Sequence, residues 1–336
     1  MNHGSWIYDN GEVIPWEHAA VHPSAHALHY GSSVFEGIRA YERSEGAAIF
    51  RLEDHLRRLH DSARLMHMDL SEYPADRLHA ACCELVRRNE HGSCYLRPIA
   101  FRDGGSLGVD GRRNPVRIIV LGLAWGSYLG DGALERGIDA RVSSWRRFPS
   151  ATMAPMAKIG GQYVNNQLAV AEVHDDGFDE AILLDPWGRL SEGSGENLFL
   201  VRDGVLWTPT AASSILAGIT RDSVIRIARD LDLEVREADL VRDHLYVADE
   251  IFLTGTAAEI TPVRSVDRHP VGDGARGPIT ARLQEEFFRL VRGETADRYG
   301  WLTPTAPSAT SPSVRRDDSS PEPTSRETVR SLAGAA

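Results

Sequence analysis

Residues 156–166 read MAKIGGQYVNN, and Lys158 within them is the only lysine of the chain. The other residues in the count of lysine plus arginine are all arginines. Arginine stays protonated at any working pH, whereas a desolvated lysine amine becomes a nucleophile or a Schiff-base partner. A bias toward arginine codons would leave an occasional lysine on the surface. Here the neighbours Ala157 and Ile159 and the glycine pair that follows offer no charged partner. We therefore predict a buried, reactive amine.

The composition favours a metabolite as the principal partner. The chain has 336 residues, enough for two domains, and its 42% hydrophobic and 25% charged residues are typical of a globular protein. A net charge of −11 argues against nucleic acid or an anionic membrane, because both bind basic surfaces. The N-terminus has no basic and apolar targeting pattern, and no apolar window reaches the length of a membrane span. We expect a cytoplasmic protein.

The cysteines and histidines do not form a recognisable metal motif. Cys82, Cys83 and Cys94 lack CxxC spacing, so we expect reduced structural thiols rather than disulfides or a zinc site. His22, His26 and His29 have a spacing compatible with metal, but Pro23 interrupts the helix that would bring them to one face. We expect no metal there.

Residues 1–125 predict a small α+β domain. A turn at Asn10-Gly11 joins two apolar runs and predicts a hairpin. Helical periodicity follows over 53–68 and 74–88, and strands are expected over 94–102 and 116–125.

The rest of the chain predicts a larger, β-rich domain. Residues 126–137 are rich in glycine and are typical of an interdomain loop. The large domain over 138–302 is expected to contain helices at 161–177, 218–232 (with Thr220 as the N-cap) and 278–293, antiparallel strands over 179–209, and a strand and turn over 249–263. Residues 303–336 are rich in Pro, Ser and Thr, and we expect a disordered tail.

A lysine that forms an imine usually does so with pyridoxal phosphate or with a carbonyl substrate. Pyridoxal phosphate also needs a carboxylate for its ring nitrogen and an anion site for its phosphate. Glu192 follows a strand and precedes Gly-Ser-Gly, where its side chain can turn inward; a solvated turn carboxylate is the alternative. The helix start at 218–222 with Thr220, the turn with Thr256, and Arg58 could hold the phosphate, although each alone is an ordinary cap, turn or surface arginine.

Five segments together resemble one family. They are HALHYGSSVFEGIRAY followed by RLHDSA, MAKIGGQYVNN, RLSEGSGENLF, LAGITRDSV and DEIFLTGTAAEITPV. The chain resembles the branched-chain amino acid aminotransferases of pyridoxal phosphate fold type IV over about residues 5–302. The resemblance implies an α+β fold: a small N-terminal α/β domain and a larger β-rich C-terminal domain, with the active site between them.

The same resemblance assigns roles to residues. Lys158 would bind the cofactor as an imine and then move the proton between the substrate Cα and the cofactor. Glu192 would pair with the ring nitrogen and Tyr163 with the phenolic oxygen. The phosphate ligands would be Arg58, Ile219, Thr220 and Thr256. The substrate α-carboxylate would meet Tyr95 and the amides of Thr256 and Ala257, and Arg97 would bind the distal carboxylate of glutamate. The apolar pocket would be lined by Phe35, Tyr30, Tyr128 and, from a neighbouring subunit, Val109.

The activity implied is transamination of L-leucine, L-isoleucine and L-valine with 2-oxoglutarate, in at least a homodimer. Other fold type IV enzymes remain as alternatives: D-amino acid or (R)-amine aminotransferases and aminodeoxychorismate lyase. A non-catalytic scaffold and a histidine-based metal enzyme are alternatives of other classes. The tail beyond residue 302 has no counterpart in the family pattern.

Overall fold

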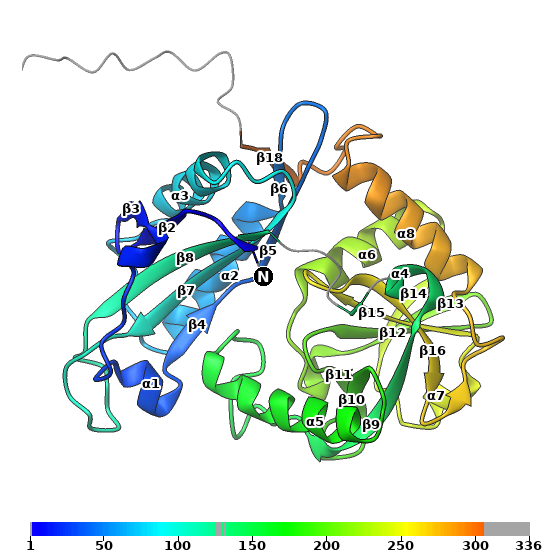
Figure 1. The fold of residues 1–336 in the computed structure, drawn as a ribbon. Helices are drawn as coiled ribbons and strands as arrows, with labels where there is room; N and C mark the ends of the chain where they lie inside the picture. Colours follow the sequence, from blue (N-terminus) through cyan, green and yellow to red (C-terminus); the bar gives the residue numbers. More distant parts are fainter. Residues whose placement is uncertain (1, 125–128, 131, 306–336) are drawn as a thin grey trace, which may run out of the picture. The chain divides into compact units, whose positions relative to one another are not determined.

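The computed structural model describes residues 2–124, 129–130 and 132–305, which contain two nine-stranded sheets (Figure 1). The first sheet has the strand order β18-β6-β5-β7-β8-β2-β3, with β1 beside β8 and β4 beside β7. Its strands are β1 (Asn2–His3), β2 (Trp6–Asp9), β3 (Glu12–Pro15), β4 (Ser33–Phe35), β5 (Ile38–Tyr41), β6 (Ala48–Phe50), β7 (Cys94–Arg102), β8 (Val116–Ala124) and β18 (Leu302–Pro304).

Two amphipathic helices pack on the first sheet. The helices α2 (Leu52–Leu65) and α3 (Ala75–Arg88) contact each other, and they contact β4, β2 and β8 (Figure 1). Their apolar faces meet the sheet in one core cluster that contains Leu56, Leu59, Leu78 and Leu96. A short helix, α1 (His26–Tyr30), contacts β7.

The second sheet has the strand order β11-β10-β9-β16-β15-β12-β13-β14, with β17 beside β16. Its strands are β9 (Ile138–Arg146), β10 (Glu180–Leu184), β11 (Leu190–Gly193), β12 (Asn197–Arg202), β13 (Val205–Pro209), β14 (Val235–Ala238), β15 (Glu250–Gly255), β16 (Glu259–Val266) and β17 (His269–Pro270). One further pairing, Glu192 with Asn197, joins β11 to β12. Consequently six strands form a closed ring, and Glu192 lies where the ring closes.

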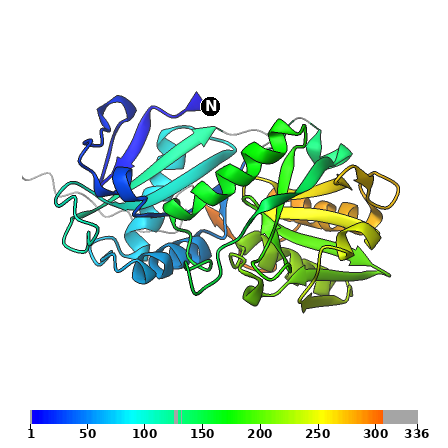
Figure 2. The same cartoon turned by 90° about the horizontal axis from the view of Figure 1, so that it is seen from below.

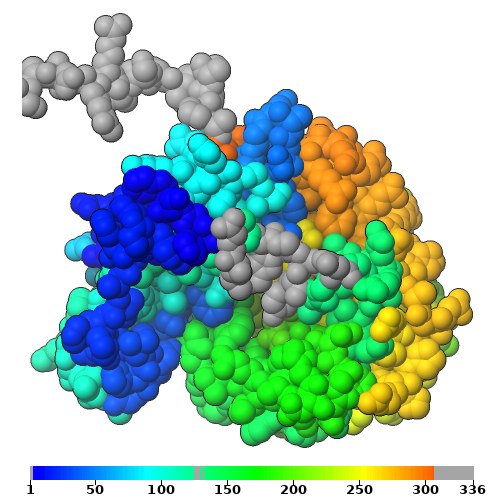
Figure 3. Space-filling view, in the orientation of Figure 1, coloured from blue at the N-terminus to red at the C-terminus, as the bar shows by residue number. Residues whose placement is uncertain are grey.

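Helices cover the second sheet as well. The helix α5 (Tyr163–Asp175) contacts β9 and β10, whereas α6 (Ile219–Asp230) and α8 (Pro278–Val291) contact β15 (Figures 1 and 2). The shorter helices are α4 (Ala133–Arg136) and α7 (His244–Val247), and the 3-10 turns are η1 (Trp16–His18), η2 (Gly160–Gln162) and η3 (Ala211–Ser213). The helix α5 lies at the surface (Figure 3), where it exposes Val164 and Leu168.

The predicted α+β class is confirmed by this mixture of helices and sheets and by the structural comparisons given below. The hairpin is present, with its turn at Asn10 and Gly11, both of positive φ. The division into two domains stays a prediction. Parts of the expected loop at 126–137, and residues 306–336 of the expected tail, lie outside the described residues.

Two local predictions are wrong. Thr220 is not the N-cap of α6, because the helix begins at Ile219 and Gly218 is the cap. A Cβ at Gly218 would lie 1.8 Å from Oδ1 of Asn197, so a larger residue there would displace the buried Asn197 side chain. Residues 303–305 are not a disordered tail: β18 pairs with β6, and the Thr305 amide donates to the Ala47 carbonyl. That pairing is long-range, which the local composition could not reveal.

Within the described ranges, no helix is both long and apolar enough to cross a bilayer. The same residues contain no group of three or more His, Cys, Asp or Glu side chains arranged to hold a metal. The three cysteines are free and buried. Burial raises the pKa of the Cys94 thiol to about 12, so this thiol is unreactive at neutral pH.

Candidate active site

The segment that leads from β9 into α5 carries Lys158, and hydrogen bonds tie its backbone to α2 and to β4 of the first sheet. The Lys158 amide donates to Oγ of Ser62 (3.0 Å), and its carbonyl accepts from the Phe35 amide (3.0 Å). Its Nζ donates to the hydroxyl of Tyr163 (2.7 Å) and lies 5.0 Å from the Phe35 ring centroid. The side chain is half-buried rather than buried as predicted. None of the ion pairs among the described residues includes it, in keeping with its uncharged sequence neighbours.

Glu192 is buried, with an exposed fraction of 5%. Its Oε2 accepts hydrogen bonds from Nδ2 of Asn197 (3.1 Å) and from the amide of Leu216 (2.9 Å). Burial raises the pKa of the Glu192 carboxyl above its ordinary value, although the Arg147 guanidinium and the Leu216 amide act in the opposite direction. The alternative of a solvated turn carboxylate is therefore wrong.

Arg147 is a site residue that the sequence analysis missed. Its Nη2 lies 2.8 Å from Oε1 of Glu192, and its Nη1 donates to Oδ1 of Asn166 (2.9 Å). The Arg147 and Glu192 side chains are 5% and 7% exposed, so the charges are paired away from water. Nothing in the sequence distinguishes Arg147 from the adjacent Arg146, because only the path of the chain after β9 turns one of them inward.

One cavity brings these groups together. It is lined by Lys158, Tyr163, Glu192, Arg147 and Leu216, among others. An amine and a buried carboxylate thus face the same space from different elements. This is the pair of groups that a flat aldehyde cofactor with a protonatable ring nitrogen requires, so these residues fit pyridoxal phosphate.

The residues expected at the phosphate lie at the start of α6 and on α2. Ile219 and Thr220 are the first residues of α6, where unpaired backbone N–H groups and the helix dipole favour an anion. Arg58, on α2, donates through Nη1 to the carbonyl of Ala217 (2.8 Å), directly before this helix. Thr256 lies half-buried in the turn between β15 and β16. Arg39 donates to the carbonyl of the adjacent Ala257 (3.3 Å), which ties this turn to β5.

Glu36 is a second residue that the sequence analysis missed, and it orients Arg58. Its carboxylate is fully buried and accepts from Nε (2.6 Å) and Nη2 (2.8 Å) of Arg58 and contacts Nδ1 of His55 (2.7 Å). Burial alone would raise the pKa of Glu36. The Arg58 guanidinium and His55 outweigh burial and hold the pKa well below its usual range. The carboxylate is therefore charged, and the guanidinium is fixed in one orientation.

A group of aromatic rings and the Arg97 guanidinium lies near Lys158. The ring of Phe35 lies 4.9 Å from the ring of Tyr163, and the Arg97 guanidinium lies 4.5 Å from the Phe35 centroid. Arg97 also donates through Nη2 to the hydroxyl of Tyr95 (2.9 Å). Gly37 leaves room for this hydroxyl, since a Cβ there would lie 1.9 Å from it. In the described part of the chain, the buried Nε of Arg97 finds no hydrogen-bond partner.

Two predicted pocket residues form a separate, exposed group. Tyr30 is 48% exposed, and its hydroxyl donates to the carbonyl of Leu107 (2.8 Å). Val109, in the same loop as Leu107, is 81% exposed. No contact recorded among the described residues links either of them to Lys158 or Phe35. Tyr128, also expected in this pocket, lies outside the described residues.

Comparison with known proteins shows the family of the chain. The model of the family described as amino-transferase class IV matches residues 33–266. The chain is 50% identical over 302 residues to the branched-chain-amino-acid aminotransferase of Escherichia coli (strain K12), covering 88% of this chain and 96% of that protein.

Solved structures agree as well. A crystal structure of the Escherichia coli branched-chain amino acid aminotransferase matches with a TM-score of 0.88 and 49% identity, covering 90% of this chain and 100% of that one. The branched-chain amino acid aminotransferase of Thermobaculum terrenum, in its PLP-bound holo form, matches with a TM-score of 0.85 and 38% identity, covering 91% of this chain and 100% of that one.

Proposed function

The chain belongs to the class IV aminotransferases, and from that premise we propose that it transfers amino groups between branched-chain amino acids and 2-oxoglutarate with pyridoxal phosphate as cofactor. The predicted family, activity and cofactor class are confirmed by relatives that match nearly the whole folded chain. The observation that carries the proposal is the cavity shared by the amine of Lys158 and the carboxylate of Glu192.

Bound pyridoxal phosphate supplies an electron sink that makes the Cα proton of an amino acid acidic. Lys158 is the group that holds the cofactor and moves this proton. Its Nζ donates to the Tyr163 hydroxyl and lies near the Phe35 ring, which limits its motion and its access to water. Arginine could not do this work, because its guanidinium does not lose a proton in the working pH range.

Glu192 and Arg147 hold the ring-nitrogen end of the cofactor. Glu192 accepts hydrogen bonds from Asn197 and Leu216 on one oxygen and pairs with Arg147 on the other, so the carboxylate cannot rotate freely. A fixed, buried carboxylate keeps a ring nitrogen protonated more effectively than a solvated one. The proposed ligands of the cofactor phosphate are Arg58, Ile219, Thr220 and Thr256.

Arg97, Tyr95 and Phe35 determine which substrates the site accepts. Glutamate needs a cation for its distal carboxylate, and Arg97 offers an unpaired Nε and a guanidinium on the Phe35 ring. Leucine, isoleucine and valine need apolar walls, which the aromatic rings provide. The α-carboxylate is assigned to Tyr95 and to the amides of Thr256 and Ala257.

The proposal includes a homodimer in the cytoplasm. The support for the homodimer is the exposed apolar group of Tyr30, Leu107 and Val109, which are 48%, 50% and 81% exposed in the single chain. Apolar side chains exposed side by side are typical of a surface covered by another chain. A second subunit would cover them and complete the substrate pocket.

A half-reaction assay tests the proposed activity. The purified protein is loaded with pyridoxal phosphate, and the absorbance change to the pyridoxamine form is followed after adding a single amino acid. L-leucine and L-glutamate should each produce the change, whereas D-alanine should not. Conversion by D-alanine without L-leucine would assign the chain to another branch of the family.

A further inference from the structure

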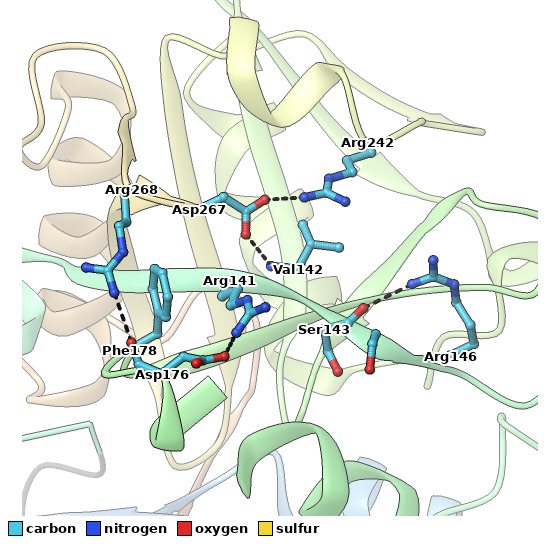
Figure 4. Close-up of a pocket in the computed structure, with 10 residues that line it drawn as sticks. Arg141, Val142, Ser143, Arg146, Asp176, Phe178, Arg242, Asp267 and Arg268 are labelled. Carbon is cyan, nitrogen blue, oxygen red and sulfur yellow. Dashed lines mark hydrogen bonds and ion pairs between the residues drawn. The ribbon is translucent and has the colours of Figure 1, made fainter. Parts of the chain in front are cut away.

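A second cavity, of about 670 Å³ and open to solvent, lies beside β9 on the second sheet and is lined by four arginines, three of them exposed (Figure 4). They are Arg141 and Arg146 of β9, Arg242 before α7, and Arg268 of the turn between β16 and β17. Asp176 and Asp267 are the carboxylates in its wall. The proposed function uses none of these side chains.

The arginines fall into two kinds. Arg141 pairs with Asp176, and Arg242 pairs with Asp267 (2.6 Å). In the described ranges neither Arg146 nor Arg268 has a carboxylate partner; their recorded hydrogen bonds are to the carbonyls of Ser143 (3.0 Å) and Asp176 (3.1 Å). Among the lining residues four arginines stand against two aspartates, with Glu172 bound to Ser143 and Ser144 beside them, although the whole chain has a net charge of −11. A cationic hollow in an acidic protein concentrates anions.

The backbone around the two unpaired arginines is irregular. The pairing of β9 with β10 shifts register, because Val142 pairs with Ile182 and Arg146 with Leu184. Four residue steps along β9 therefore lie opposite two along β10. Such bulges redirect side chains. Asp267 (φ 50°) and Arg268 (φ 67°) form the two-residue turn between β16 and β17, where Asn-Gly is the relaxed choice. The positive φ at both positions is the geometry of such a turn, and it fixes where the Arg268 side chain leaves the backbone.

Arg268 is exposed, and two contacts hold it and its turn in place. Its guanidinium lies 4.9 Å from the centroid of the Phe178 ring, and the neighbouring Asp267 accepts from the Val142 amide (3.0 Å). In Figure 4 Arg268 and Arg146 lie at opposite ends of the cavity, with Arg141 and Arg242 between them. A ligand that reaches both ends therefore needs two separated anionic groups.

We propose that this cavity binds a small polyanion with at least two anionic groups, of the size and charge of a tripolyphosphate. Arg146 and Arg268 hold its ends, and the paired Arg141 and Arg242 add donors between them. The site differs from the active site, because Arg147, the next residue after Arg146, turns away to pair with Glu192. It does not depend on the proposed activity.

Calorimetric titration of the protein saturated with pyridoxal phosphate tests the site, because the cofactor then occupies the other predicted anion site at α6. Tripolyphosphate and orthophosphate are titrated at equal ionic strength in buffer without metal or phosphate. The matched variants are Arg146→Gln/Arg268→Gln and, as a control with the same charge change, Arg64→Gln/Arg88→Gln on α2 and α3. Arg64 and Arg88 lie at the surface with side chains 81% and 41% exposed.

We expect tripolyphosphate to bind with a dissociation constant below about 1 mM and at least about tenfold tighter than orthophosphate. The cavity variant should lose at least about tenfold in affinity, and the control should bind as the wild type does. If the cavity variant does not fold, Arg146→Gln alone, which leaves the turn intact, should show the loss. No binding, equal binding of the two anions, or equal loss in the cavity and control variants would overturn the proposal.

Discussion

Replacement of Arg97 by methionine should separate the two substrate classes of the proposed enzyme. Methionine keeps an unbranched apolar side chain against Phe35 but removes the guanidinium that lies 4.5 Å from its ring. Leucine, which has no distal carboxylate, needs only the apolar wall. Glutamate and 2-oxoglutarate would enter the same pocket with an unpaired charge.

The structure sets the size of the two losses. Removing one partner of a buried, hydrogen-bonded charge pair costs about 2–5 kcal/mol, which is about 30-fold to a few thousand-fold in kcat/KM for glutamate. For leucine the loss comes from the contacts of the guanidinium with the Phe35 and Tyr95 rings at 4.5 and 5.2 Å and from its hydrogen bond to the Tyr95 hydroxyl. A cation–π contact is worth about 0.5–1 kcal/mol, so the loss of both contacts should lower the leucine rate by about 30-fold at most, and the glutamate reaction loses these contacts in addition to its charge pair.

Single-turnover kinetics of each half-reaction is the appropriate assay, because steady-state transamination couples both substrates. Arg97→Lys is the control: it keeps a positive charge without the planar fork and should give an intermediate loss for glutamate. Equal losses for leucine and glutamate in Arg97→Met would refute the assignment of Arg97 to the distal carboxylate.

Three further perturbations test the cofactor site. Lys158→Ala should abolish turnover and leave no cofactor fixed to the protein by borohydride, as peptide mapping would show, and Lys158→Arg should be equally inactive; turnover in either would contradict the role of the amine. Arg147→Met should lower the free energy of unfolding, measured in urea, by about 3–5 kcal/mol, because Glu192 stays buried without its cation. The double variant Arg147→Met/Glu192→Gln should recover most of the lost free energy. Additive losses would show that the pair is not coupled. Glu36→Gln should cost a similar amount at neutral pH. Because the folded pKa of Glu36 is lowered, its charge stabilises the fold above the unfolded carboxyl pKa. The difference in free energy of unfolding between the variant and the wild type should therefore hold above about pH 5 and narrow below about pH 4. A difference that does not depend on pH would argue against a charged Glu36.

Local sequence patterns predicted most of the secondary structure. The strand expected over 94–102 is β7 (Cys94–Arg102), and the helix expected over 278–293 is α8 (Pro278–Val291). These signals are the alternation of apolar residues, the turn residues and the helix periodicity. Each acts over a few residues, so it can be recognised without knowledge of the fold. The prediction of Thr220 as the cap was wrong, because α6 begins at Ile219 after Gly218, which lies against the side chain of Asn197 from β12.

The chemistry of the candidate site could also be predicted from the sequence, because the one lysine and the motifs around Glu192 and Thr220 identify the cofactor class. The partners of these residues were not. Arg58 donates to a carbonyl 159 positions away, and the Lys158 amide donates to a hydroxyl 96 positions away. Among so many arginines, no local signal separates Arg147, which pairs with Glu192, from Arg146, which lines another cavity. The sequence by itself thus determined which reactive groups are present, because reactivity is a property of the residue type. Only the tertiary structure decided which charges are paired, buried or free, because those properties depend on neighbours that chain folding brings from far along the sequence.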